Sequence, residues 1–282
     1  MKLSNQFNNL FISWKNCLES IKLGKIFLIF LGYAVVQIAF ILMLMNCAYP
    51  PFSSFLVPLM TRLFGEAAIH YPNNFLVLPA MFFWVNLVLS GLIGIILVGT
   101  ATDLFSNTYK KKAINLGESL RVMLANYAIL FLIWMVETAV LVGIFLGVPA
   151  LLEKMAFFAE RGDLTLQVAA SLVAIVVGAV FVYTTALVVL DRRGAFGALG
   201  QSLSLFAKHP VITILLFAIP NLIRMPVDLL SGKTRFLITK FNPEMVGIVL
   251  VLSILISVFS NYLLIGTVTR YFTLLRERTS YS

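Results

Sequence analysis

Six long apolar segments constrain this chain more than any other feature of its sequence. Each holds about twenty or more residues, the length at which a helix matches a hydrocarbon core of roughly 30 Å. The segments do not show the alternation of apolar and polar residues that marks the strands of a membrane barrel. Backbone polar groups inside lipid must be satisfied within the chain, so we expect an all-α polytopic membrane protein. The six predicted transmembrane helices are 26–47, 76–101, 124–148, 166–190, 211–230 and 245–270.

Composition agrees with this prediction. Hydrophobic residues make up 60% of the 282 residues and charged residues 12%, whereas soluble domains carry about 25% charged residues. The connections between the apolar segments are too short for a separate catalytic domain, so we expect one membrane domain over 1–282. The first apolar run begins only at Ile26 and lacks a small-residue cleavage site, so we expect it to remain a helix rather than a signal peptide.

Lysine and arginine are distributed unevenly between the two predicted sides of the membrane. One side carries 14 of them: Lys2, Lys15, Lys22, Lys25, Lys110, Lys111, Lys112, Arg121, Arg192, Arg193, Lys208, Arg270, Arg276 and Arg278. The other side carries 7: Arg62, Lys154, Arg161, Arg224, Lys233, Arg235 and Lys240. The positive-inside rule therefore places both termini in the cytoplasm. We attribute the net charge of +9 to anionic lipid headgroups as partners rather than to nucleic acid.

Three connections share a serine-centred pattern. WKNCLESIK (14–22), AINLGESLR (113–121) and FGALGQSLS (196–204) place Ser20, Ser119 and Ser202 in register. Apolar residues spaced by three and four positions indicate one face of an amphipathic helix lying at the membrane surface. Those residues are Trp14, Cys17 and Ile21; Ala113, Leu116, Leu120 and Met123; and Phe196, Leu199, Leu203 and Phe206. The predicted contacts with lipid headgroups are Lys22, Lys25, Lys110, Lys111, Lys112, Arg121, Arg192, Arg193 and Lys208.

The ends of the apolar segments repeat a second pattern. GTAT (99–102) and GTVT (266–269) match each other, and Thr184-Thr185 lies near the corresponding place. Together with the serines, these motifs predict three tandem units at about 10–102, 103–190 and 191–282. Each unit would hold an interfacial helix followed by a transmembrane hairpin. The alternative is that any basic connection beside a membrane looks amphipathic.

One segment resembles a known group of proteins. Residues 184–217, TTALVVLDRRGAFGALGQSLSLFAKHPVITILLF, combine an apolar run ending in aspartate, a glycine-alanine linker, an amphipathic stretch with a central serine, and a new apolar run. This arrangement resembles bacterial six-helix integral membrane proteins of unknown function. That group includes the membrane region attached to some glycerophosphodiester phosphodiesterases. The resemblance implies a bacterial inner-membrane protein, but not the phosphodiesterase activity, because this chain has no room for the catalytic barrel.

Polar residues occur near the middle of five apolar segments. They are Gln37, Asn86, Glu137, Asn221, Ser257 and Asn261. Glu137 is the ionisable member, and an unpaired charge at that depth is costly, so we expect it to be neutral, paired or beside water. One interpretation is a polar midplane site with Glu137 as a proton or cation site. The other, which the sequence favours, is hydrogen bonding between helices.

The second half of the fifth apolar segment is irregular. Pro220 and Pro226 each remove a backbone donor, and broken helices line substrate sites in some transporters. Arg224 and Asp228 lie four residues apart and can form an ion pair at the outer interface. The favoured interpretation is that the helix ends early, with 225–242 lying along that interface.

The sequence lacks the motifs of common enzymes. It has neither a phosphate-binding glycine loop nor a nucleophile elbow, and its two histidines are too few for a histidine metal site. We therefore expect a non-enzymatic protein without cofactor or metal: a scaffold, an accessory subunit or a lipid-organising protein. Its expected partners are membrane lipids, especially anionic headgroups, or other membrane protein subunits. The alternative is a carrier for a small or lipid-like substrate that uses a site around Glu137.

Overall fold

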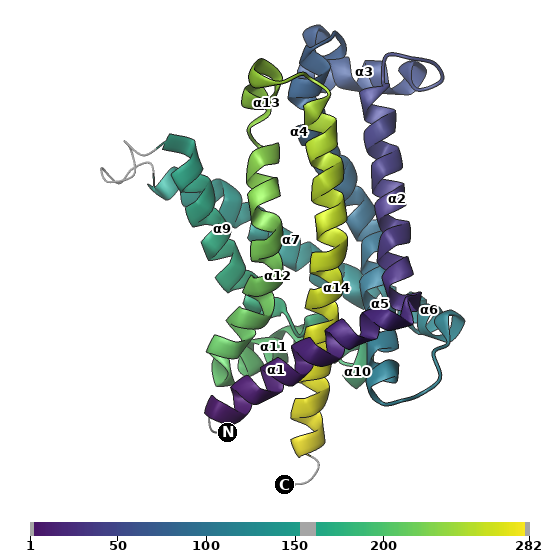
Figure 1. Ribbon diagram of the computed structural model, residues 1–282, viewed down its shortest axis with the longest axis vertical. Coiled ribbons are helices and arrows are strands. Elements are labelled where there is room, and N and C mark those ends of the chain that lie inside the picture. The colour runs from purple at the N-terminus through teal and green to yellow at the C-terminus, as the bar shows by residue number, and fades with distance from the viewer. Residues whose placement is uncertain (1–2, 153–161, 280–282) are drawn as a thin grey trace. The chain divides into compact units, whose positions relative to one another are not determined.

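The structure, a computed structural model, describes residues 3–152 and 162–279, and this part of the chain is helical with no strand (Figure 1). Lys2, Lys154 and Arg161, which enter the charge count above, lie outside the described residues. The segment η3 is a π-helix that joins α4 to α5. In chain order the elements are α1 (Leu3–Ser20), η1 (Ile21–Leu23), α2 (Lys25–Met45), α3 (Ser53–Phe64), η2 (Glu66–Ile69), α4 (Asn73–Leu89), η3 (Ser90–Gly94), α5 (Ile95–Tyr109), α6 (Leu116–Ala125), α7 (Tyr127–Leu152), α9 (Gly162–Phe181), α10 (Thr184–Asp191), α11 (Ala195–Lys208), α12 (Pro210–Ser231), α13 (Thr234–Lys240) and α14 (Met245–Thr279).

Within the described residues, six helical stretches are long and apolar enough to cross a membrane, which confirms the predicted number. They are Lys25–Met45, Asn73–Tyr109, Tyr127–Leu152, Thr165–Asp191, Pro210–Ser231 and Met245–Glu277. The second and sixth extend well past their predicted ends at 101 and 270. Thr108 and Thr273 lie in these extensions, and each donates its hydroxyl to a carbonyl oxygen of its own helix, so both polar side chains are satisfied there.

The fifth stretch does not end early, so the favoured interpretation, in which this helix ends before residue 225, is wrong. Helix α12 runs through Pro220 and Pro226 to Ser231, and α13 begins only at Thr234. Pro220 has no N–H to donate to the Leu216 carbonyl, and two side chains donate to other carbonyl groups beside this proline. Asn221 Nδ2 donates to the Phe217 carbonyl (2.7 Å), and Ser260 Oγ donates to the Pro220 carbonyl (2.6 Å). A proline-containing helix can continue where neighbouring side chains satisfy the carbonyl groups in this way.

The fourth stretch is the interrupted one. Val182 and Tyr183 form a turn between α9 and α10, where the sequence predicts one continuous helix over 166–190. The turn directs the Tyr183 ring into a fully buried position, and its hydroxyl lies 3.2 Å from Thr213 Oγ1. Tertiary packing of this ring accompanies the break in the helix.

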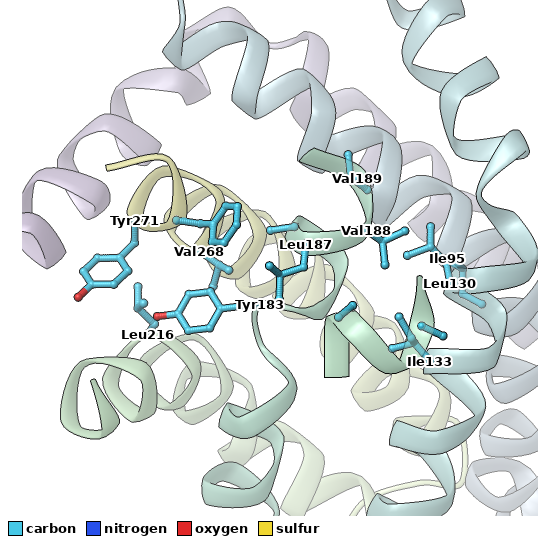
Figure 2. Close-up of a cluster of buried hydrophobic side chains, with 14 of the residues drawn as sticks. Ile95, Leu130, Ile133, Tyr183, Leu187, Val188, Val189, Leu216, Val268 and Tyr271 are labelled. Atoms are coloured by element: carbon cyan, nitrogen blue, oxygen red, sulfur yellow. The ribbon is translucent and has the colours of Figure 1, made fainter. Parts of the chain in front are cut away.

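The chain divides into two compact units. The first contains residues 1–29, 93–222 and 260–282, and the second contains 30–92 and 223–259. A hydrophobic core in the first unit surrounds Tyr183, whose ring lies among Leu187, Leu216 and Val268 (Figure 2). Because α5, α7, α10, α11, α12 and α14 all supply residues to this core, the first unit holds together around the interrupted stretch.

The three serine-bearing segments are all helical, as α1, α6 and α11, and all three belong to the first unit. Ser20, Ser119 and Ser202 are each buried. Cys17 is buried beside Ser20, and Met123 is buried beside Ser119. Other residues of the predicted apolar faces are exposed instead. They are Leu116 and Leu120 on α6, and Phe196 and Leu203 on α11. The predicted apolar face is therefore wrong in detail, since packing divides it between a buried and an exposed side.

Helix α1 packs closely on the second half of α14. The Cys17 thiol donates weakly to the carbonyl oxygens of Tyr262 (3.7 Å) and Leu263 (3.9 Å), and the Ser20 hydroxyl lies 2.7 Å from the Tyr262 hydroxyl. Burial raises the pKa of the Cys17 thiol to about 12, so the thiol stays protonated at neutral pH. Gly266 permits this approach, because a Cβ there would meet Cys17 Sγ and lie 3.0 Å from the Phe105 ring.

We predict that Gly266→Ala destabilises the protein, because the added methyl group must displace Cys17 and Phe105. Overpacking of this kind costs about 1–3 kcal/mol. Gly143→Ala is the matched control, since a Cβ at Gly143 meets nothing within 4 Å. Replacing glycine by alanine inside a helix raises the free energy of unfolding by at most about 1 kcal/mol. Unfolding midpoints in detergent measure both. Equal midpoints for the two variants would contradict the close packing of α1 on α14.

Candidate functional site

A cavity of about 190 Å³ lies inside the first compact unit. Helices α5, α7, α9, α10, α12 and α14 and the turn residue Val182 supply its walls. Most of the wall is apolar, with the Phe181 and Phe217 rings among its members. The lining residues are Val98, Thr102, Glu137, Leu141, Gly178, Phe181, Val182, Thr184, Thr185, Ala186, Phe217, Leu264, Ile265, Val268 and Thr269.

Glu137 supplies the one ionisable side chain among these lining residues. It projects from the middle of α7 and is partly exposed to the cavity. Its Oε1 atom lies 2.8 Å from Thr184 Oγ1, at the first residue of α10. A carboxyl group in apolar surroundings is stable when it is protonated or meets a cation. The geometry therefore supplies a single acid with one hydrogen-bonding partner and an open side.

Three of the four threonine hydroxyls around the cavity lie within hydrogen-bond distance of a carbonyl oxygen of their own backbone, and Thr185 is the exception. Thr102 Oγ1 donates to the Val98 carbonyl (2.9 Å), and Thr269 Oγ1 donates to the Ile265 carbonyl (2.7 Å). Thr184 Oγ1 lies 2.7 Å from the Phe181 carbonyl oxygen as well as near Glu137. A hydroxyl has one proton and two acceptor lone pairs, so Thr102 and Thr269 retain acceptor capacity and no donor.

The break between α9 and α10 leaves carbonyl groups that no longer receive helix hydrogen bonds. Ser202 Oγ, from α11, donates to the Val180 carbonyl oxygen at 2.6 Å. Thr184 Oγ1 faces the next carbonyl oxygen, that of Phe181. Buried carbonyl groups without donors are costly, so these two hydroxyls make the break tolerable beside the cavity.

Gly178 sets the position of the aromatic wall. A Cβ at this position would lie 2.6 Å from Cε1 and Cζ of Phe217, so the Phe217 ring of α12 lies directly against the α9 backbone. Both residues line the cavity. The missing side chain of Gly178 thus lets an aromatic ring form one side of the site.

The structure does not gather the six predicted midplane residues into one site. Gln37 Nε2 donates to Asn86 Oδ1 within the second compact unit. Asn221 and Ser257 hydrogen-bond to carbonyl groups of their own helices. Asn221 and Asn261 belong to the same compact unit as Glu137 but do not line the cavity. The Gln37–Asn86 pair fits the hydrogen-bonding interpretation, whereas Glu137 lies in a different setting.

Arg224 and Asp228 form the ion pair that their spacing allows. Arg224 Nε lies 2.6 Å from Asp228 Oδ2, and both side chains are about 40% exposed, with values of 40% and 39%. Ser253 Oγ donates to the other carboxylate oxygen of Asp228 at 2.7 Å. All three residues lie in the second compact unit, so the pair joins α12 to α14 there. A half-exposed pair of this kind contributes little stability, and we interpret it as structural.

The predicted headgroup contacts share one property. All nine side chains are exposed, and all nine belong to the first compact unit: Lys22, Lys25, Lys110, Lys111, Lys112, Arg121, Arg192, Arg193 and Lys208. By contrast, Arg62, Arg224, Lys233, Arg235 and Lys240, which the charge count assigns to the opposite side, belong to the second unit. The cations named here thus fall in different units, although the two sets alternate along the chain.

Sequence reasoning missed the threonines as members of the site. Thr102, Thr185 and Thr269 line the same cavity, although they are far apart in the chain. The sequence feature that could have identified them is the similarity of GTAT (99–102), Thr184-Thr185 and GTVT (266–269), which indicates repeated units and also places these threonines at corresponding positions. Phe217 and Gly178 carried no signal, because an apolar ring and a glycine are common in any membrane helix.

No protein-family model, curated protein or solved structure matches this chain.

We predict that Ser202→Ala lowers stability, because it leaves the Val180 carbonyl without a donor in a buried place. The loss of a buried partner costs about 1–3 kcal/mol. Ser204→Ala, two residues away on the exposed side of α11, is the control and should leave the unfolding midpoint unchanged. The measurement is thermal unfolding of both variants in detergent. An unaltered midpoint for Ser202→Ala would show that the break does not depend on α11.

Proposed function

We propose that this protein is a multi-pass membrane carrier or binding protein that holds a small, largely apolar molecule in the cavity at Glu137. The observation that carries the proposal is the cavity itself, with apolar walls, a few convergent polar groups and one acidic side chain. Sites for small molecules have this composition. A tightly packed scaffold would have no need of such a space next to a carboxyl group.

The size of the cavity and the broken helix support the same proposal. An apolar cavity of about 150 Å³ is large enough to bind benzene, and this cavity has about 190 Å³. Interrupted helices at membrane depth are tolerated where they line a cavity, and transporters build substrate sites from them. The turn at Val182–Tyr183 provides such an interruption at the cavity wall, since Val182 is one of the lining residues.

We place the protein in the bacterial cytoplasmic membrane with both termini in the cytoplasm. The nine exposed cations of the first compact unit support this orientation, because positively charged residues collect on the cytoplasmic side. The resemblance of residues 184–217 to bacterial six-helix membrane proteins supports the same location.

We also propose that the chain consists of three tandem units, each with a serine helix followed by a hairpin. The serine contacts support this. Ser119 of α6 donates to Asp103 of α5, and Ser202 of α11 donates to Val180 of α9. Ser20 of α1 contacts Tyr262 of α14. Each serine thus meets the last span of the preceding unit, when the third unit is counted as preceding the first.

A second candidate function is the organisation of lipid, and the serine helices favour it. Besides its buried serine side, each helix exposes large apolar side chains. The exposed apolar residues are Phe7, Phe11 and Leu18 on α1; Leu116, Leu120 and Leu124 on α6; and Phe196 and Leu203 on α11. Exposed charges such as Lys22, Arg121 and Lys208 occupy the remaining side of these segments. An interfacial helix that packs on a bundle needs these three sides: one for the protein, one for lipid tails and one for headgroups and water.

We predict that Leu141→Trp abolishes ligand binding, because the larger side chain fills the cavity. Val142→Trp is the matched control, since Val142 is the next residue of α7 and is 38% exposed. The probe is 2-(4-fluorophenyl)ethanol, a neutral amphiphile small enough for the cavity, and fluorine NMR in phosphatidylcholine nanodiscs measures its binding. The bound signal should vanish in Leu141→Trp and persist in Val142→Trp. Empty nanodiscs correct for partitioning, and an absence of binding to the wild-type protein would overturn the carrier proposal.

For the second candidate, we predict that Arg192→Gln/Arg193→Gln reduces the amount of anionic lipid that co-purifies with the protein. Each basic residue near a membrane surface contributes about 1 kcal/mol of attraction to anionic lipid. Arg235→Gln/Lys240→Gln removes two exposed cations of the second unit and is the control, which should retain anionic lipid. Mass spectrometry of lipid extracts gives the ratio of lipid to protein. Equal retention by both double variants would argue against a selective headgroup surface on the first unit.

A further inference from the structure

Most polar groups of the cavity at Glu137 have their hydroxyl protons engaged already and can only accept hydrogen bonds from a ligand. The hydroxyl protons of Thr102 and Thr269 go to the carbonyl oxygens of Val98 and Ile265. The proton of Thr184 is directed to either the Phe181 carbonyl or Glu137. An ionised carboxylate is an acceptor as well. Thr185 Oγ1 can donate as well as accept, so acceptors outnumber donors in the cavity and a ligand that carries donors satisfies more of these groups.

The charge of the cavity points in the same direction. Glu137 is the ionisable residue among those that line it, and the rest of the lining carries no formal charge. An ionised Glu137 in apolar surroundings needs a positive charge close by, and its proton is the simplest one. A ligand with one positive charge can replace that proton and leave the cavity neutral. The Phe181 and Phe217 rings add to this preference, because cations are attracted to aromatic faces.

Other charged groups near the ends of the lining helices are already engaged or exposed. Asp103, which follows Thr102, accepts from Ser119 and Asn107, and Asp191 pairs with Arg276. Arg270, which follows Thr269, lies 3.8 Å from Glu277 and over the Tyr109 ring. On the packed helices α6 and α11, the charged residues Glu118, Arg121 and Lys208 are exposed, and His209 precedes α12. None of these residues is among those that line the cavity.

We propose that the ligand of this cavity is a hydrophobic monocation, a small aryl- or alkylammonium, and that Glu137 is its counter-charge. This inference rests on the proposed binding function and names the class of its substrate. The ammonium group donates to Glu137 and to the acceptor lone pairs of the threonines, while the hydrocarbon part lies against the apolar wall. Charge-assisted hydrogen bonds of this kind are roughly twice as strong as neutral ones.

Binding then exchanges a cation for a proton. In the empty cavity, protonated Glu137 donates to Thr184 Oγ1, and the Thr184 proton goes to the Phe181 carbonyl oxygen, which matches the two distances of 2.8 and 2.7 Å. When the ammonium group enters, Glu137 releases one proton and becomes a carboxylate. The Thr184 hydroxyl keeps its proton on the Phe181 carbonyl oxygen, and the lone pair that Glu137 no longer occupies accepts from the ammonium group. Both charge states are thus accommodated while the Phe181 carbonyl retains its donor.

A matched pair of probes tests the proposal. 2-(4-Fluorophenyl)ethylamine carries an ammonium group at neutral pH, and 2-(4-fluorophenyl)ethanol has the same size without the charge. Fluorine NMR on the full chain in phosphatidylcholine nanodiscs, with empty nanodiscs as the blank, gives both affinities. We expect the amine to bind about tenfold or more tightly than the alcohol, a difference of about 1.4 kcal/mol. The advantage should shrink as the pH falls, because protons compete with the amine for Glu137.

Glu137→Gln and Glu118→Gln form the matched pair of variants. Glu137→Gln should lose the preference for the amine over the alcohol, because glutamine is similar in size and cannot ionise. Glu118→Gln alters an exposed acid on α6 and should keep the preference. Calorimetry of the wild-type protein in two buffers of different ionisation enthalpy provides a readout that needs no variant. We expect up to one proton to be released per amine bound, and none per alcohol.

The outcomes separate this inference from the proposed function. If neither probe binds to the wild-type protein, the cavity is not a ligand site and both proposals are wrong. If the alcohol binds as tightly as the amine, or if Glu137→Gln retains the preference, the cavity binds neutral amphiphiles and the assignment of a cation is overturned. Binding of the amine without release of a proton contradicts the exchange at Glu137.

Discussion

The structure of the first compact unit depends on how two carbonyl groups are satisfied where the fourth apolar stretch breaks. Water is absent from the interior of a bilayer, so a carbonyl without a donor there costs several kcal/mol. The Val180 carbonyl receives the Ser202 hydroxyl of α11, and the Phe181 carbonyl receives the Thr184 hydroxyl. These two bonds permit the turn that buries the Tyr183 ring in the core and brings Thr184 to Glu137. One turn thus contributes a ring to the core, a carbonyl group that binds α11, and the threonine at the polar end of the cavity.

The serine helices show why a small hydroxyl residue occupies the same position in three segments. A helix that rests on a bundle must approach it closely, and a serine side chain is short enough to reach a backbone or side-chain oxygen at that distance. Ser20, Ser119 and Ser202 are buried and hydrogen-bonded in this way, each to a different helix. A larger apolar side chain at these positions would hold the helix away and leave its partner unsatisfied. The exposed phenylalanines and leucines of the same helices then face away from the bundle, where lipid is a suitable environment.

Sequence patterns predicted some of the site and missed the rest for a physical reason. In a soluble protein, apolar residues identify the buried face of a helix. Lipid is as apolar as a protein core, so this signal is absent in a membrane helix, and Leu203 and Met123 look alike although one is exposed and the other buried. The sequence locates the polar residues within the apolar segments, but their partners depended on packing. Gln37 met Asn86, whereas Glu137 met Thr184 and a cavity. Prolines did not predict where the helices break. Helix α12 continues through Pro220, whereas α9 ends at Phe181 without a proline.

The sequence by itself determined that the chain is helical and that six stretches are long and apolar enough to cross a membrane. Length and hydropathy suffice for that, because a helix satisfies its own backbone whatever its neighbours are. The spacing of Arg224 and Asp228 also sufficed for their ion pair, since both residues lie on one helix. Only the tertiary structure decided where a helix breaks, which threonines share a cavity and which acid lines it. Those features join residues as distant as Thr102 and Thr269, and their contacts depend on the packing of whole helices rather than on any local pattern.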